Sequence, residues 1–350
     1  MTLQSLGWTA FFEAHLQNNA WRPCRVVSEA TDLFLVHDGE REVFAVPRGR
    51  LRNHPDFPPV VGDWVLVKCA DDDRYVVESI LPRRSAIVRK QPASRASAHV
   101  LAANVDRVLL VTSMNQDFSV RRLERYLTLV WESGASPVIV LTKADLVSDS
   151  DLFRREAKKC ALGFPVLCVS SVTGDGIGEL RSLLVAGETL VLLGSSGVGK
   201  STLVNVLGGA DMRETRSVRE KDGKGRHATT DRHLMRLPSG ALMIDTPGLR
   251  EVQLWASDMA VAQTFPEISA LAIHCRFRDC QHQGEPGCAV AAGIAAGQID
   301  VERLHSLRHL RLELDYLDRR SDPLSAMQHK SKIKRMTRAQ EQQQRRRKKP

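Results

Sequence analysis

The order of two motifs along this chain limits its possible folds more than any other feature. A phosphate-loop pattern, Gly-x-x-x-x-Gly-Lys-Ser, spans residues 194–201, and the tetrad Thr-Lys-Ala-Asp spans residues 142–145. Where both motifs occur in one nucleotide-binding domain, the phosphate loop normally opens the domain and the tetrad follows. The reversed order predicts a circularly permuted α/β domain.

The phosphate-loop pattern lies in the context that its chemistry requires. It follows an apolar, strand-like segment at 190–193 and precedes a helical pattern at 202–207, which a chance glycine-rich turn would lack. Loop N–H groups and the helix N-terminus bind phosphate oxygens, Lys200 reaches the β and γ phosphates as a catalytic group, and Ser201 ligates Mg²⁺. The predicted nucleotide-binding residues here are Gly194, Ser195, Ser196, Gly197, Val198, Gly199, Lys200, Ser201 and Thr202.

The tetrad predicts a preference for guanine. An aspartate at the position of Asp145 accepts hydrogen bonds from guanine N1–H and the exocyclic amine, which adenine lacks, while the Lys143 stem covers the base. The tetrad and the next serine pair each end an apolar strand, where ligands of open α/β sheets collect. The predicted base-binding residues are Thr142, Lys143, Ala144, Asp145, Ser170 and Ser171. An ATPase with a coincidental tetrad is the alternative.

Two further segments are expected to contact the γ phosphate and its metal. Asp245-Thr-Pro-Gly248 follows the apolar segment 241–244, and it would supply a Mg²⁺-side carboxylate from Asp245 and a phosphate-sensing Gly248. In the polar segment 223–230, either Thr229 or Thr230 would add a hydroxyl to Mg²⁺, and the sequence does not decide which.

The residue that positions the attacking water is less clear from the sequence. Leu249 stands where Ras-like enzymes carry a glutamine, and leucine cannot orient water by hydrogen bonding. His227 is the best local candidate for this catalytic role, although a solvated loop histidine is an equally good interpretation. If nothing replaces the glutamine, the protein is a nucleotide-binding switch with negligible turnover.

A compact cluster of thiols and one imidazole predicts a metal centre. Cys275, Cys280, His282 and Cys288 form the ligand set of a closed, structural, tetrahedral zinc site, and free thiols are the alternative. The other cysteines lie in apolar or strand-like contexts and are expected to be buried thiols: Cys24, Cys69, Cys160 and Cys168.

The N-terminal part and the C-terminal tail differ from the nucleotide-binding segment. Short alternating apolar runs from about residue 21 to 81 predict a small all-β barrel, with a basic loop at 47–52 and a basic linker at 82–95. The chain has 50 basic and 41 acidic residues, and ten of the basic residues but only one of the acidic residues lie in 330–349. The remaining chain therefore carries 40 basic and 40 acidic residues. The tail is expected to be disordered until it contacts nucleic-acid phosphates.

Together these motifs resemble the RsgA family of circularly permuted GTPases. The resemblance rests on 48–52 and 61–64 in the barrel, 117–127 in the first crossover, the permuted motifs and the Cys/His cluster. It implies an OB barrel, a zinc domain, binding of the small ribosomal subunit and its rRNA, and hydrolysis of GTP to GDP that the subunit stimulates. It also favours His227 as the catalytic residue. Residues 227–230 read His-Ala-Thr-Thr, whereas the family usually shows three threonines after the histidine, so the Mg²⁺ threonine stays open.

We therefore expect a multi-domain protein with an N-terminal OB barrel, a permuted GTPase domain and a C-terminal zinc-binding helical module. The expected bounds are 1–95, 96–257, 258–328 and a tail at 329–350. No apolar stretch approaches membrane-spanning length, so a cytoplasmic monomer without a membrane partner is expected, with one Zn²⁺ and with Mg²⁺ bound beside GTP.

Overall fold

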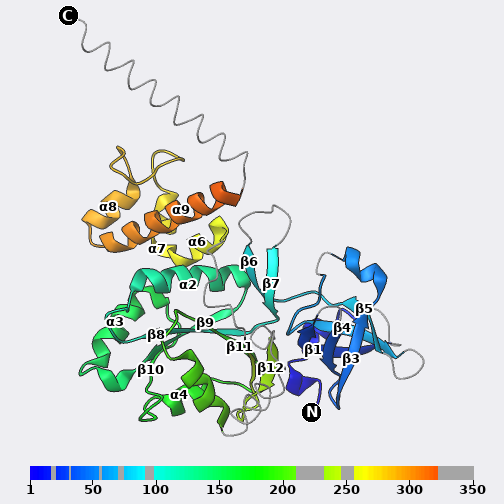
Figure 1. The fold of residues 1–350 in the computed structure, drawn as a ribbon. Helices are drawn as coiled ribbons and strands as arrows, with labels where there is room; N and C mark the ends of the chain where they lie inside the picture. The colour runs from blue at the N-terminus through cyan, green and yellow to red at the C-terminus, as the bar shows by residue number, and fades with distance from the viewer. Residues whose placement is uncertain are drawn as a thin grey trace, which may run out of the picture. The chain divides into compact units, whose positions relative to one another are not determined.

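The protein contains two compact units. The structure is a computed structural model, and it describes residues 1–16, 21–30, 33–54, 57–69, 75–90, 98–209, 232–245 and 256–321. The first unit holds residues 1–88, 100–252 and helix α6 (Asp258–Thr264), and the second is built mainly from residue 265 onward. Figure 1 shows the elements of both, coloured along the chain.

Five short strands near the N-terminus close into a barrel. They follow the order β1-β2-β3-β5-β4, and β4 also pairs with β1. Their alternating sequence places one set of apolar side chains inside, including Val26, Val36 and Val65. This confirms the predicted OB-type barrel. The bounds are β1 (Arg22–Ala30), β2 (Leu33–His37), β3 (Glu42–Pro47), β4 (Trp64–Cys69) and β5 (Tyr75–Ile80), with η1 (Gln4–Leu6), α1 (Ala10–Glu13) and η2 (Gly49–Asn53).

The predicted nucleotide-binding part is a mainly parallel sheet of order β10-β9-β8-β11-β13-β12; within the described residues, only β12 is antiparallel to its neighbour. At the β12 edge, His233 pairs with Ser28 of β1, so the sheet continues into the barrel. The strands are β8 (Arg107–Ser113), β9 (Ser136–Thr142), β10 (Val166–Cys168), β11 (Thr189–Leu193), β12 (His233–Arg236) and β13 (Leu242–Asp245).

Helices cover both faces of this sheet, because successive strand residues point to opposite sides. On one face, α2 (Val120–Ser133) and α3 (Ser150–Ala161) bury their apolar residues against the sheet. On the other face, α4 (Ile177–Ser182) and the helix at 200–209 do the same. Ser119 begins α2 by accepting a hydrogen bond from Arg122 N, and Gly134 ends the helix in a left-handed conformation.

The structure corrects three sequence interpretations of residues 47–103. The predicted linker at 82–95 contains β6 (Ala86–Lys90), which pairs with β7 (Ala98–Ala103) as a two-stranded sheet. The expected basic loop at 47–52 contains η2, and its Arg48 and Arg50 bind the Glu78 carboxylate at 2.6 and 3.1 Å. Cys69, the last residue of β4, is exposed rather than buried, as is Lys68 before it.

The second unit is helical. It contains α7 (Pro266–Ala272), α8 (Ala289–Ala295) and α9 (Val301–Ser321), with the Cys/His cluster between α7 and α8. Leu304, Leu307 and Leu310 are the buried apolar residues of α9, whereas Val301 and Leu312 are exposed. Among the described residues, none of the helices is both long and apolar enough to cross a membrane.

Candidate nucleotide site and metal centre

The sequence-predicted nucleotide residues meet at one edge of the parallel sheet. Strands β8, β9, β10, β11 and β13 run in the same direction, so their C-terminal ends share that edge. The phosphate loop follows β11, the tetrad begins with the last residue of β9, Ser170 follows β10, and Asp245 ends β13. This is where open α/β sheets bind ligands.

The phosphate loop is held close to the neighbouring strand. A Cβ atom on Gly194 would lie 2.1 Å from the Val111 carbonyl oxygen, so a larger residue there would push the loop off β8. The Lys200 ammonium donates hydrogen bonds to the carbonyl oxygens of Gly194, at 2.7 Å, and Ser195. The loop therefore holds the Lys200 ammonium beside the backbone that would surround a phosphate group.

Thr142, at the end of β9, contacts the phosphate loop. Its buried hydroxyl lies 2.6 Å from the Val198 carbonyl oxygen and 3.2 Å from that of Thr112, and its single proton is shared between these acceptors. The first tetrad residue thus contacts the phosphate loop with its side chain and connects the end of β9 to that loop.

Ser170 orients the carboxylate that is predicted to read guanine. The buried Ser170 hydroxyl donates to Asp145 Oδ1 at 2.5 Å and accepts hydrogen bonds from the backbone N–H groups of Val172 and Thr173. Its own backbone N–H donates to the Asp175 carbonyl oxygen at 2.9 Å. No local motif in the sequence predicts this side-chain contact, because Ser170 and Asp145 are 25 residues apart. The base contact of Ser171 stays a prediction.

Two other side chains near this edge were not identified from the sequence as contacts. The Tyr126 hydroxyl on α2 lies 3.3 Å from Ser195 Oγ in the phosphate loop. After β8, Asp117 accepts a two-pronged hydrogen bond from Arg122, and this guanidinium holds the pKa of the Asp117 carboxyl below its usual value. Only long-range packing brings Tyr126 to the loop, so no local motif could have revealed it.

Two of the predicted Mg²⁺ ligands, Ser201 and Asp245, are within the described residues. Ser201 lies in the first turn of the helix at 200–209, and Asp245 ends β13, the neighbour of β11 in the sheet. These hydroxyl and carboxylate oxygens suit a hard cation. His227, Thr229, Thr230 and Gly248 lie outside the described residues, and so does Leu249.

The four residues of the Cys/His cluster fit a zinc ion. Their ligand atoms all lie within 4.8 Å of one another, and His282 Nδ1 lies 3.6 Å from Cys275 Sγ and 3.4 Å from Cys288 Sγ. The sulfurs of Cys275 and Cys288 are 3.9 Å apart, close to the separation of about 3.8 Å that two Zn–S bonds give in a tetrahedral site. With four protein ligands, the ion would stabilise the fold of this unit and leave no open position for chemistry.

Nearby groups hold this cluster in place. Burial lowers the pKa of the His282 imidazole, which favours the neutral form that binds metal. The Glu285 carboxylate accepts hydrogen bonds from the backbone N–H groups of Gln281, at 2.9 Å, and Gln283, at 2.6 Å. Cys288 begins α8, and its sulfur accepts a hydrogen bond from Ala291 N.

Fold and site together define a circularly permuted phosphate-loop protein with an OB-type barrel and a Cys₃His module. The sequence model of the RsgA GTPase family matches residues 80–255, and the chain belongs to this family. The small ribosomal subunit biogenesis GTPase RsgA of Opitutus terrae is 43% identical, with 96% of both chains covered. RsgA 2 of Lactiplantibacillus plantarum is 44% identical over 89% of this chain and 88% of its own.

Solved structures agree with this assignment. The crystal structure of YjeQ from Thermotoga maritima is 28% identical and covers 84% of this chain and 98% of its own, with a TM-score of 0.65. The crystal structure of YloQ, a circularly permuted GTPase, is 25% identical and covers 86% of this chain and 97% of its own, with a TM-score of 0.63. The predicted permuted order is therefore confirmed.

Proposed function

We propose that this chain is a Mg²⁺-dependent GTPase that binds the small ribosomal subunit and hydrolyses GTP to GDP late in subunit maturation, as an assembly and release checkpoint. The observation that carries the proposal is the meeting of phosphate loop, base-reading tetrad and Asp245 at one sheet edge. The ribosomal partner is supported by the names of its relatives.

The proposed roles follow from the placement of each group. Lys200 neutralises charge on the β and γ phosphates, and Asp145, oriented by Ser170, selects guanine. Ser201 and Asp245 would hold Mg²⁺, together with Thr229 or Thr230; the bound ion would neutralise developing phosphate charge. His227 is proposed to position the attacking water in place of a glutamine.

The barrel and the basic tail are proposed to dock on rRNA, and the zinc module to contact the subunit. We further propose that the protein acts as a monomer in the cytoplasm. Because residues 330–349 carry ten basic residues and one acid, phosphate contact is the expected mode of tail binding.

Co-sedimentation with purified small subunits tests the proposal directly, comparing GTP, a non-hydrolysable analogue and GDP. We expect the analogue to retain the protein on the subunit and GDP to release it. Hydrolysis should rise when subunits are added, and Lys200→Ala should abolish it without unfolding the protein. Binding that is equal in all three nucleotide states would contradict the checkpoint role.

A second candidate is an RNA-binding assembly factor whose nucleotide site only switches between bound states. Leu249 in the usual glutamine position favours it. In that case subunits would bind in a nucleotide-dependent way, yet hydrolysis would stay at its basal level when they are added. Competition between ATP and labelled GTP would reveal an adenine-binding site.

A further inference from the structure

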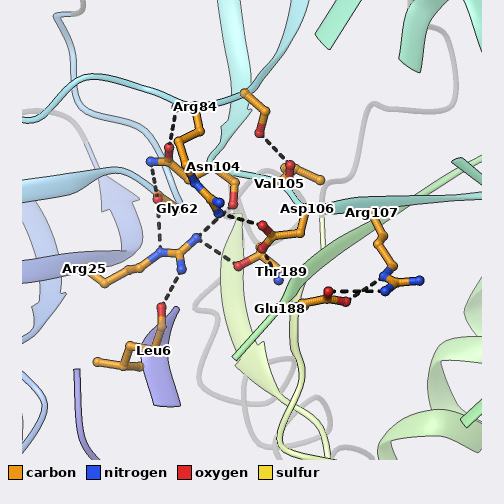
Figure 2. Close-up of polar contacts among 11 residues, drawn as sticks. Leu6, Arg25, Gly62, Arg84, Asn104, Val105, Asp106, Arg107, Glu188 and Thr189 are labelled. Carbon is orange, nitrogen blue, oxygen red and sulfur yellow. Dashed lines mark hydrogen bonds and ion pairs between the residues drawn. The ribbon is translucent and has the colours of Figure 1, made fainter. Parts of the chain in front are cut away.

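Arg25 of β1 is a fully buried cation that contacts several separate segments of the first unit. Its side chain is 1% exposed. Nε donates to the Gly62 carbonyl oxygen at 3.0 Å, and Nη1 donates to that of Leu6. Nη2 donates to the Asn104 carbonyl oxygen at 3.2 Å and to Thr189 Oγ1 at 2.9 Å. Figure 2 shows the guanidinium at the centre of these contacts.

These four acceptors belong to different parts of the fold. Leu6 and Gly62 are in the N-terminal segment and the barrel, Asn104 follows β7, and Thr189 is the first residue of β11. All four are neutral oxygens, and burial lowers the pKa of Arg25 to about 10, so the guanidinium remains charged at neutral pH. A buried charge that loses its hydrogen bonds is costly, so separating the barrel from β11 would be penalised.

The surrounding groups are also packed and bonded. A Cβ atom on Gly7 would lie 2.5 Å from Arg25 Nη1, so the N-terminal segment approaches the guanidinium as closely as glycine allows. On the opposite side, the Thr189 backbone N–H donates to Asp106 Oδ2 at 2.8 Å, and Arg84 binds Asp106 Oδ1 at 2.6 Å. Thr189 therefore binds Asp106 through its backbone N–H and binds Arg25 of the barrel through its hydroxyl oxygen.

We propose that Arg25 is a positioning residue that couples the barrel to the nucleotide site through Thr189 and β11. The far end of β11 leads directly into the phosphate loop at Gly194. Nucleotide binding would then oppose opening of the barrel. By linkage, a ligand that binds the barrel would change nucleotide affinity by the same factor by which nucleotide changes the affinity for that ligand. This deepens the proposed function, because the ligand on the barrel is rRNA only if that function holds.

Other contacts between β1 and the nucleotide-binding sheet offer a competing route. Ser28 pairs with His233, and the Glu29 carboxylate lies 2.7 Å from Arg232 Nη1. If these contacts carry the coupling, removing the Thr189 hydroxyl will leave it unchanged. The test therefore has to remove that single hydroxyl while preserving shape.

Thr189→Val is the decisive variant, with Thr189→Ser as the rescue because serine restores the acceptor. Thr128→Val is a matched control, since Thr128 is another fully buried, hydrogen-bonded threonine in the first unit. Amide hydrogen exchange in the barrel is measured without nucleotide and with GDP at about 100 times each variant's own Kd. Nucleotide affinity should change less than about threefold in all variants.

In the wild type, in Thr189→Ser and in Thr128→Val, GDP should slow the most protected barrel amides by up to about 100-fold. In Thr189→Val and in Arg25→Lys, the slowing should fall below about tenfold. The inference would be overturned if GDP did not slow amide exchange in the wild-type barrel. It would also be overturned if GDP slowed exchange in Thr189→Val as much as in the wild type. Because the purified chain and GDP suffice, failure to co-sediment with subunits would refute the proposed function and leave this result standing.

Discussion

At the scale of single residues, the Ser170 hydroxyl controls the carboxylate that is proposed to read guanine. Ser170→Ala removes the 2.5 Å hydrogen bond to Asp145 and leaves two backbone N–H groups without that acceptor. A hydrogen bond to a charged group contributes about 1.5 to 3 kcal/mol, so we expect GTP affinity to fall by at least about tenfold. Titration with a fluorescent GTP derivative measures this affinity.

The control for this experiment is Ser182→Ala. The Ser182 hydroxyl is exposed and bonds only within its own helix, to the Glu179 carbonyl oxygen, among the contacts of the described residues. Its loss should leave affinity unchanged. Equal affinities for both variants would show that Asp145 needs no orienting partner.

Arg25 gives a second prediction at this scale, on stability. Arg25→Met keeps a long side chain but leaves the buried oxygens of Leu6, Asn104 and Thr189 without this donor, whereas the Gly62 carbonyl oxygen keeps its hydrogen bond from the Asn104 side-chain amide. Each unsatisfied buried group costs about 1 to 3 kcal/mol, so the free energy of unfolding should fall by roughly 3 kcal/mol or more. Urea unfolding of the purified protein measures the loss. A decrease below about 1 kcal/mol would mean that water replaces the guanidinium.

The side-chain contacts of Ser170 and Arg25 could not be predicted from the sequence. Asp145 and Lys200 belong to motifs whose spacing is local, so a role for each can be predicted without a structure. The partners of Arg25 lie at Leu6, Gly62, Asn104 and Thr189, far apart along the chain. In the sequence Arg25 is simply one residue of a barrel strand, and only the packed fold shows what it binds.

At the scale of elements, apolar periodicity predicted most of the first unit. The continuous apolar runs became parallel strands, and the crossover between β8 and β9 contains helix α2 (Val120–Ser133). β6 was missed because its segment is rich in arginine and lysine, and its partner β7 lies beyond the predicted linker. The domain boundaries at 95, 257 and 328 stay predictions.

The loop between α7 and α8 yields a prediction about metal. Purified protein should contain about one zinc ion per chain, because four ligand atoms already lie within 4.8 Å of one another. Cys280→Ser combined with His282→Ala should lose the metal and the exchange protection of α8, since metal binding and folding are linked in such sites. Elemental analysis and hydrogen exchange measure the two effects.

Cys69→Ser is the matched control for the zinc variant, because Cys69 is an exposed thiol outside the cluster. It should keep both the metal and the protected α8. Wild-type protein without zinc, purified without chelator, would refute the metal centre. If the double variant still contained zinc, the ion would be bound by other residues.

At the scale of the whole molecule, the distribution of charge separates recognition from catalysis. Residues 330–349 carry ten basic residues and one acid, whereas the rest of the chain has 40 residues of each sign. If the proposed function holds, we expect long-range attraction to RNA phosphates to come from the tail and to depend on salt. The nucleotide site, built within a neutral body, should be much less sensitive to salt.

Removing residues 330–350 tests this separation. Each phosphate contact contributes about 0.7 to 0.9 to the slope of log K against log salt, so ten contacting cations would account for a slope of about 7 to 9. We expect the truncated protein to bind small subunits more weakly at low salt and with a much shallower slope, while its GTP affinity and basal hydrolysis stay unchanged. A control with the ten basic residues replaced by glutamine keeps the length of the tail and should behave like the truncation. If both variants retain the wild-type slope, the cations that contact RNA lie in the body, where the exposed side chains of Arg48 and Arg50 on the barrel would be the next to replace.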